Sequence, residues 1–253
     1  MPGPLKLLLS PVLLRQGRQV RRQALRLPEA AGPREGVVGE GALRLRLLVV
    51  GDSAAAGVGV DHQAQALAAP LAERLALALD GRVAWQLVAS TGHRAADALK
   101  ALEQARLNPA DVMVTSLGVN DTVGQTPVRH WLATLDALHG VARARAGVRH
   151  TWHSAVPPME RFPVLPQPLR WVLGRDARRL DQALQRHLAG QADRGHVALP
   201  PMPGDAAGWM ARDGFHPGLL GYQAWVEALT RQMLLEGAAA FQPAEAGGAA
   251  SVA

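Results

Sequence analysis

The feature that most constrains the fold is an alternation of two kinds of segment along the chain. Five short apolar runs have the length of buried strands, at residues 45–50, 83–89, 112–117, 148–154 and 196–199. Between and after them, apolar residues recur at helical spacing, in segments 63–79, 94–105, 128–146, 169–189 and 218–235. Such alternation is typical of a parallel sheet with helices on both faces. We therefore predict an α/β fold, a three-layer α/β/α sandwich around a parallel five-stranded sheet.

Composition divides the chain into three parts. Residues 28–42 are rich in Gly, Pro and Glu and have no helical period, so we expect a linker there. Residues 1–42 then form a basic amphipathic arm and its linker, and residues 43–236 form one folded domain. The last segment, residues 237–253, is small, polar and rich in helix breakers, and we expect it to be disordered.

The positive charge of the chain is concentrated in its first part. Six basic residues precede the first acidic one, Glu29, and they are Lys6, Arg15, Arg18, Arg21, Arg22 and Arg26. The remaining basic residues equal the 21 acidic ones in number, so the net charge of +6 belongs to the arm. A formally neutral body argues against nucleic-acid binding by the folded domain.

Two interpretations of the arm remain open. Its apolar stretch, residues 5–14, is much shorter than the ~20 residues that span a bilayer, and its arginines follow that stretch, unlike those of a secretory signal. Residues 5–27 interleave leucines with arginines and could lie on an anionic membrane surface. The same leucines could instead pack on the protein's own body or on a second subunit. We expect a cytoplasmic protein, peripheral on the inner face of the membrane under the first interpretation.

Several classes of chemistry are disfavoured by what the sequence lacks. There is no cysteine, which excludes disulfides, thiolate metal sites and a cysteine nucleophile. No His-x-x-x-His pair or carboxylate cluster suggests a metal, and we expect no cofactor. Neither Gly-x-Gly-x-x-Gly nor Gly-Lys-Ser/Thr is present, which argues against a dinucleotide- or phosphate-binding module.

Residues that could take part in catalysis follow the carboxyl ends of the predicted strands, where open parallel sheets have their binding crevice. Ser53 lies among small residues after the first strand, Gly92 follows the second and Asn120 follows the third. Asp213 and His216 lie three residues apart, just before the last helix. A serine hydroxyl needs a base to take its proton, and imidazole suits that task. The carboxylate of Asp213 can orient the ring of His216.

The segments that contain these residues resemble, in their order and placement along the chain, the four sequence blocks of the SGNH hydrolases, the GDSL-type esterases and lipases. Ser53, Gly92, Asn120 and His216 match the four residues of the family name, over about residues 45–235. The resemblance implies a flavodoxin-like sheet and a Ser53–His216–Asp213 triad. It also implies an oxyanion hole made by the N–H groups of Ser53 and Gly92 and the side-chain amide of Asn120.

Substrate specificity is expected in the long segment after the fourth strand, residues 155–171, whose five prolines forbid a regular helix or central strand. Met159, Phe162, Leu165 and Trp171 could form one wall of an acyl pocket there. The alternative is that these side chains only cover the edge of the sheet.

We therefore expect a serine esterase that hydrolyses carboxylic esters with acetyl or short to medium acyl groups through an acyl-enzyme. Lysophospholipase or thioesterase activity at a membrane surface is an alternative, because the same machinery cleaves those bonds. A catalytically silent relative that binds a membrane or a protein partner is a further one. The acyl chain length, the alcohol part and the oligomeric state cannot be deduced from the sequence.

Overall fold

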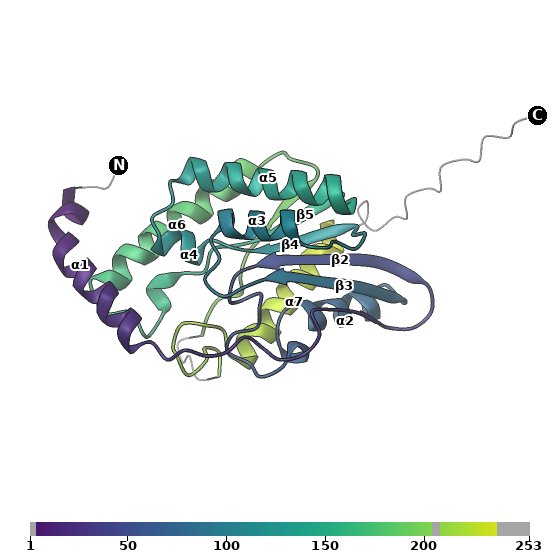
Figure 1. The fold of residues 1–253 in the computed structure, drawn as a ribbon, viewed down its shortest axis with the longest axis horizontal. Coiled ribbons are helices and arrows are strands. Elements are labelled where there is room, and N and C mark those ends of the chain that lie inside the picture. Colours follow the sequence, from purple (N-terminus) through teal and green to yellow (C-terminus); the bar gives the residue numbers. More distant parts are fainter. Residues whose placement is uncertain (1–3, 204–207, 237–253) are drawn as a thin grey trace, which may run out of the picture.

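In the computed structural model the described residues are 4–203 and 208–236, and they form a three-layer α/β/α sandwich (Figure 1). The strands of its sheet are β1 (Glu35–Val38), β2 (Leu43–Gly51), β3 (Arg82–Ala89), β4 (Val112–Ser116), β5 (His150–Ser154) and β6 (Arg194–Val197). Their order across the sheet is β1-β3-β2-β4-β5-β6. Strands β2 to β6 are parallel and have the order of a flavodoxin-like sheet. The predicted fold class and the five parallel strands are confirmed.

The sixth strand, β1, corrects one expectation. It lies within residues 28–42, where the sequence indicated only a linker, and it pairs antiparallel with β3 from Glu35↔Gln86 to Val38↔Val83. An antiparallel strand at the edge of a parallel sheet is common in mixed sheets. The folded body therefore begins before residue 43. The predicted disordered tail, residues 237–253, lies outside the described residues.

Helices cover both faces of the sheet. One face carries α2 (Ala68–Ala78) and α7 (Leu219–Glu236), and the other carries α3 (Ala95–Gln104), α5 (Val128–Ala146) and α6 (Leu169–Leu188). Strand β2 shows why two cores form, because Leu47 and Val49 join the first while Leu48 and Val50 join the second. Successive side chains of a strand point to opposite faces, so a continuous apolar run fills both layers.

Short elements connect these layers at the carboxyl edge of the sheet. They are the 3₁₀ turn η1 (Gln63–Gln65), the helix α4 (Val119–Val123) and the 3₁₀ turn η2 (Met159–Arg161). Helix α4 begins after Gly118, whose φ of 130° brings its Cα against Val156, a close approach that a side chain would block. This edge therefore gathers the loops that follow β2, β3, β4 and β5.

The basic arm forms helix α1 (Pro4–Gln23), which lies beside α6 at one end of the molecule (Figure 1). Lys6 of α1 pairs with Asp176 of α6, and Gln16 bonds to the backbone of Gln167 and Leu169. The arm thus contacts the protein's own body, one of its two predicted positions. Among the described helices, none combines the length and the apolar character needed to cross a bilayer.

Candidate active site

Ser53 lies in the loop that leaves β2 at the carboxyl edge of the sheet. A Cβ on Gly51 would come 2.7 Å from the backbone oxygen of Ser116, so only glycine lets β2 end this close to β4. Asp52 N–H donates to the same oxygen at 3.1 Å, and Val58 N–H donates to the oxygen of Ser53 at 3.0 Å. The loop therefore holds Ser53 in a compact turn with only 7% of its surface exposed.

His216 lies in the loop before α7 and meets Ser53 across 163 residues of chain. Its Nε2 lies 2.9 Å from the Oγ of Ser53. Gly59 allows this meeting, because a Cβ there would lie only 2.2 Å from the oxygen of Pro217, and its φ of 110° favours glycine. The loops that carry the alcohol and the imidazole thus touch through backbone atoms, and the predicted convergence is present.

Asp213 holds the other side of the imidazole. Its Oδ2 lies 2.6 Å from Nδ1 of His216, and its Oδ1 accepts the N–H groups of Phe215 and His216 at 2.9 and 3.0 Å. Burial alone would raise the pKa of Asp213, but the hydrogen bonds from the His216 side chain and these N–H groups outweigh it and lower that pKa. The carboxylate is therefore ionised and fixes the ring with Nδ1 protonated.

The three expected oxyanion donors come from three different loops. Within the described chain, neither the Ser53 N–H nor the Gly92 N–H donates to another protein atom. Gly92 is exposed, its φ is 86°, and a Cβ there would meet no heavy atom within 4 Å. The side-chain amide of Asn120 donates one hydrogen to the oxygen of His93 at 3.0 Å, which ties the Gly92 loop to α4 and leaves its second N–H available.

A family model matches residues 49–224, a span that contains the Ser53, Asp213 and His216 just described. That model is the GDSL-like lipase/acylhydrolase family. The chain belongs to this family. The resemblance inferred from the four sequence blocks is therefore confirmed.

Solved structures with the same fold include other GDSL-like proteins. TesA has a TM-score of 0.57 and 22% identity, over 76% of this chain and 99% of its own. A lipase/acylhydrolase from Enterococcus faecalis has a TM-score of 0.54 and 20% identity, over 80% and 100%. The esterase EstA from Pseudoalteromonas sp. has a TM-score of 0.54 and 17% identity, over 75% and 98%. The comparison with curated proteins gave no match. At these identities the structures show a shared fold.

Two further residues support the GDSL-like site, and one of them, Tyr222, was not predicted. The hydroxyl of Tyr222, on α7, donates to the backbone oxygens of Ala54 and Val58 at 2.8 and 2.9 Å and so anchors the Ser53 loop. The second is Asp52, which accepts the N–H of Ala54 at 3.0 Å. Burial raises the pKa of Asp52 to about 7, which no sequence pattern indicated. Tyr222 is the only tyrosine of the chain, which was its one available signal.

Asp121, the neighbour of Asn120 on α4, has a structural position in the fold. It is buried and accepts the N–H of Ala95, the first residue of α3, at 3.0 Å. Burial raises its pKa, against the hydrogen bonds from Ala95 and Thr126. Asp121 therefore joins the starts of α3 and α4, directly beside Asn120.

The predicted acyl wall is not formed as expected. Met159, Phe162 and Leu165 have 0%, 3% and 2% of their surface exposed, because the proline-rich segment folds back and packs them into the core beneath α6. Trp171 is 41% exposed on α6, where Arg175 lies over its ring at 5.2 Å. The first three side chains cover the sheet, which was the alternative interpretation, and they present no wall to a substrate.

Metal ligands do not gather in the described part of the chain. No group of three or more His, Cys, Asp or Glu side chains there could hold a metal ion. The chemistry available at this edge of the sheet is that of an alcohol, an imidazole, a carboxylate and hydrogen-bond donors.

Proposed function

We propose that this protein hydrolyses carboxylic esters through an acyl-enzyme on Ser53. The observation that carries the proposal is the continuous hydrogen-bonded series from Asp213 Oδ2 to His216 Nδ1 and from His216 Nε2 to Ser53 Oγ, at 2.6 and 2.9 Å. In such a series the imidazole takes the serine proton as the oxygen attacks a carbonyl carbon. Membership of the GDSL-like lipase/acylhydrolase family supports the same class of bond.

The reaction then follows in two halves. Ser53 Oγ bonds to the ester carbonyl carbon, His216 receives the proton, and the carbonyl oxygen becomes an oxyanion held by Ser53 N–H, Gly92 N–H and the Asn120 amide. As the intermediate collapses, His216 gives its proton to the leaving alcohol and the acyl group stays on Ser53. Water attacks the acyl-enzyme in the same way, releasing the acid and restoring the serine. Asp213 stays ionised throughout and stabilises the imidazolium.

Hydrolysis of p-nitrophenyl acetate and butyrate by the full chain tests this function. Ser53→Ala should abolish turnover, and its melting temperature shows whether the fold is retained. Ser90→Ala is a matched control, because Ser90 follows the neighbouring strand β3 and its hydroxyl is not bonded to His216. Equal activity of Ser53→Ala and wild type would overturn the proposal. A parallel assay with an acyl thioester and a lysophospholipid compares the alternative substrates.

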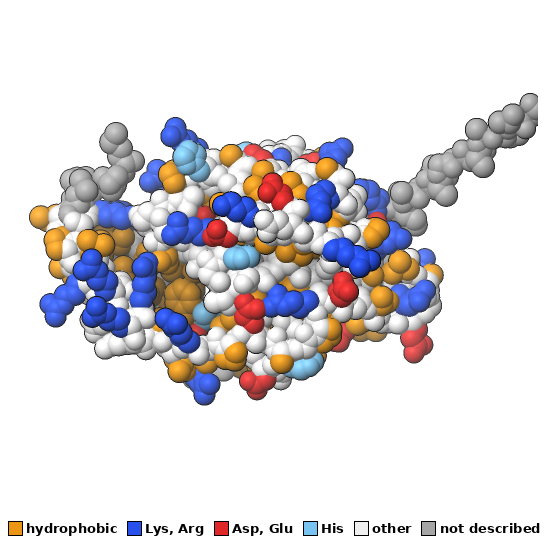
Figure 2. All heavy atoms as spheres, in the orientation of Figure 1, with side chains coloured by type: hydrophobic (Ala, Val, Ile, Leu, Met, Phe, Trp, Pro, Cys, Tyr) orange, Lys and Arg blue, Asp and Glu red, His pale blue; other side chains and the backbone are white. Residues whose placement is uncertain are grey.

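We also propose that the outward face of α1 binds an anionic membrane surface. Arg15, Arg18, Arg21 and Arg22 are exposed on this helix, and Leu14 beside them is 62% exposed. Lys and Arg side chains gather over this end of the molecule in Figure 2. Basic residues near anionic headgroups each contribute about 1 kcal/mol, and apolar side chains between them can enter the interface.

Sedimentation with phosphatidylserine vesicles tests this surface. Replacing Arg18, Arg21 and Arg22 by Gln should weaken binding about 100-fold, by the ~1 kcal/mol that each contributes. The control replaces three exposed arginines elsewhere by Gln and so changes the net charge equally; they are Arg129, Arg179 and Arg186. Equal sedimentation of the two triple variants would refute the membrane proposal.

A further inference from the structure

The inward face of α1 is apolar but incompletely covered. Leu9, Leu13, Gly17 and Val20 recur every three or four residues, so they lie on one face of the helix, and all four are partly exposed. Leu13 and Val20 pack against the core cluster beneath α6. A Cβ on Gly17 would meet no heavy atom within 4 Å. This face therefore points toward the body of the protein without filling the space before it.

Polar contacts hold α1 in this position. Lys6 bonds to Asp176 of α6 and to Gln125, which follows α4. Ten residues later, Gln16 donates to the oxygen of Gln167 at 2.6 Å and accepts the N–H of Leu169 at 3.1 Å. These contacts join α1 to α6 and to the end of α4, the helix that carries Asn120. These polar contacts thus hold α1 beside the carboxyl edge of the sheet.

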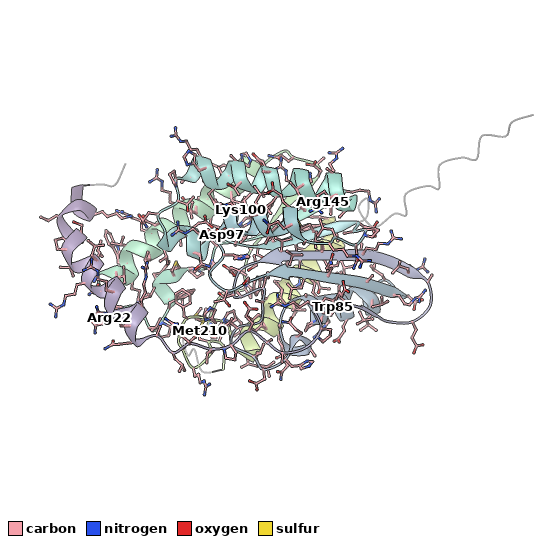
Figure 3. The ribbon with its side chains drawn as sticks, in the orientation of Figure 1. Arg22, Trp85, Asp97, Lys100, Arg145 and Met210 are labelled. Carbon is pink, nitrogen blue, oxygen red and sulfur yellow. The ribbon has the colours of Figure 1, made fainter. Side chains whose placement is uncertain are left out.

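The body carries three apolar side chains that are associated with the same core cluster as the inward face of this helix. Val164, Met210 and Phe215 are partly buried and pack against the same core cluster as Leu13 and Val20. Figure 2 shows a hollow with hydrophobic atoms in its walls between α1 and the body. In the view of Figure 3, Met210 is drawn on the body and Arg22 on α1.

Phe215 lies directly beside the reacting groups. Its ring lies 5.2 Å from the ring of His216, which bonds to Ser53, and 5.1 Å from the buried ring of Phe162. Phe215 is therefore an apolar side chain of the body in contact with the base of the triad. The free N–H groups of Ser53 and Gly92 belong to the same edge of the sheet.

We propose that α1 and the side chains of Val164, Met210 and Phe215 are the two walls of an acyl channel that ends at Ser53. The occupant is the unbranched acyl chain of the ester substrate, because the side chains named on the two walls are apolar and the available N–H donors lie at the Ser53 end. This inference rests on the proposed ester hydrolysis. It assigns acyl selection to the arm, in place of the proline-rich segment that the sequence suggested.

The channel is tested by measuring kcat/KM for a series of p-nitrophenyl esters from acetate to laurate, each below its micellar concentration. Each methylene taken from water into an apolar site favours binding by about fourfold. Wild-type kcat/KM should therefore rise over several methylenes, while acetate, which does not reach α1, gives the baseline.

The decisive variant is Gly17→Trp, which fills the hollow from a position where a side chain has room. It should shorten the preferred acyl chain and lower kcat/KM for laurate at least tenfold, with acetate turnover changed less than twofold. Leu8→Trp is the matched control, because Leu8 is on the same helix and 78% exposed to solvent. It should leave the whole series unchanged.

The double variant Leu13→Ser and Val20→Ser tests the wall without blocking it. It should flatten the rise with chain length, whereas Leu8→Ser with Leu14→Ser should not. The channel proposal would be overturned if Gly17→Trp left the chain-length series unchanged. It would also be overturned if the Leu13→Ser/Val20→Ser and Leu8→Ser/Leu14→Ser double variants had equal effects. If acetate hydrolysis is lost only in Ser53→Ala and the wild-type series is flat, the channel is wrong while the proposed function stands. If Ser53→Ala retains full activity, the proposed function itself fails.

Discussion

Replacing Asp213 by Asn separates the orienting role of the carboxylate from its bulk. In the structure Oδ1 accepts two backbone N–H groups, from Phe215 and His216 at 2.9 and 3.0 Å, and only an oxygen can do so. The amide oxygen of Asp213→Asn should keep that position, which places its NH₂ group opposite Nδ1 of His216. An NH₂ group donates, so Nδ1 must accept, and the neutral ring then carries its hydrogen on Nε2. That hydrogen points at Ser53 Oγ, 2.9 Å away, and the ring can no longer take the serine proton.

The expected loss of activity is large because, in nearly every molecule of the variant, Nε2 of His216 carries a hydrogen and cannot act as the base. The same substitution in a serine protease triad lowers kcat by about 10⁴-fold, which corresponds to about 5 kcal/mol of transition-state stabilisation. We expect a decrease of this order in kcat for p-nitrophenyl butyrate, with KM changed little. Thermal unfolding of the variant should show an intact fold, since both backbone hydrogen bonds are kept.

Asp181→Asn is the matched control for this substitution. Asp181 also pairs with a histidine, with Oδ1 2.9 Å from Nε2 of His196, and also accepts a backbone N–H, from Val156 at 2.9 Å. Its replacement should affect stability but leave kcat within about threefold, because the Asp181–His196 pair makes no hydrogen bond to Ser53, His216 or Asp213. If Asp213→Asn stays within tenfold of wild type, or if the two variants lose activity equally, the assigned orienting role is refuted.

Three further substitutions test other parts of the site. Asn120→Ala should lower kcat by about 10²–10³-fold, the usual loss for one oxyanion donor, with little change in KM; a rise in KM with kcat unchanged would contradict that role. Tyr222→Phe leaves the oxygen of Val58 without the hydroxyl that donates to it and the oxygen of Ala54 with only the N–H of Gly57, and it should cost about 1–3 kcal/mol in urea denaturation; unchanged stability would show that the hydroxyl does not anchor the loop. Burial raises the pKa of Asp52 from its usual 3.8 to about 7, so the carboxyl favours folding when protonated and this contribution is lost as pH rises through that range. Relative to Asp52→Asn, wild type should therefore lose up to about 4 kcal/mol between about pH 4 and pH 8, and parallel pH profiles would contradict the raised pKa.

The groups of the triad could be predicted because their signals are local. Asp213 and His216 are three residues apart, so a single turn brings carboxylate and imidazole together, and the structure places them 2.6 Å apart. The position of Ser53 followed from the end of an apolar run, because parallel strands end at a common edge. The contact between Ser53 and His216 was inferred from the family resemblance, and the backbone approach at Gly59 that permits it was not foreseen.

The parts that could not be predicted depend on non-local packing. Strand β1 has four residues, and only its ladder with β3 makes it a strand. The apolar character of Met159, Phe162 and Leu165 was plain in the sequence, but a segment without a period does not reveal which side faces the core. The same holds for α1, whose leucines were compatible with lipid or protein until the contacts of Lys6 and Gln16 fixed its orientation.

Covalent labelling tests most directly whether Ser53 is a nucleophile activated by His216. A fluorophosphonate probe reacts with an activated serine. Intact-mass and peptide mass spectrometry of the labelled full chain should show one adduct, on Ser53, absent from Ser53→Ala and formed far more slowly in His216→Ala. A folded protein that takes up no probe, or one that is labelled at another residue, would contradict the account.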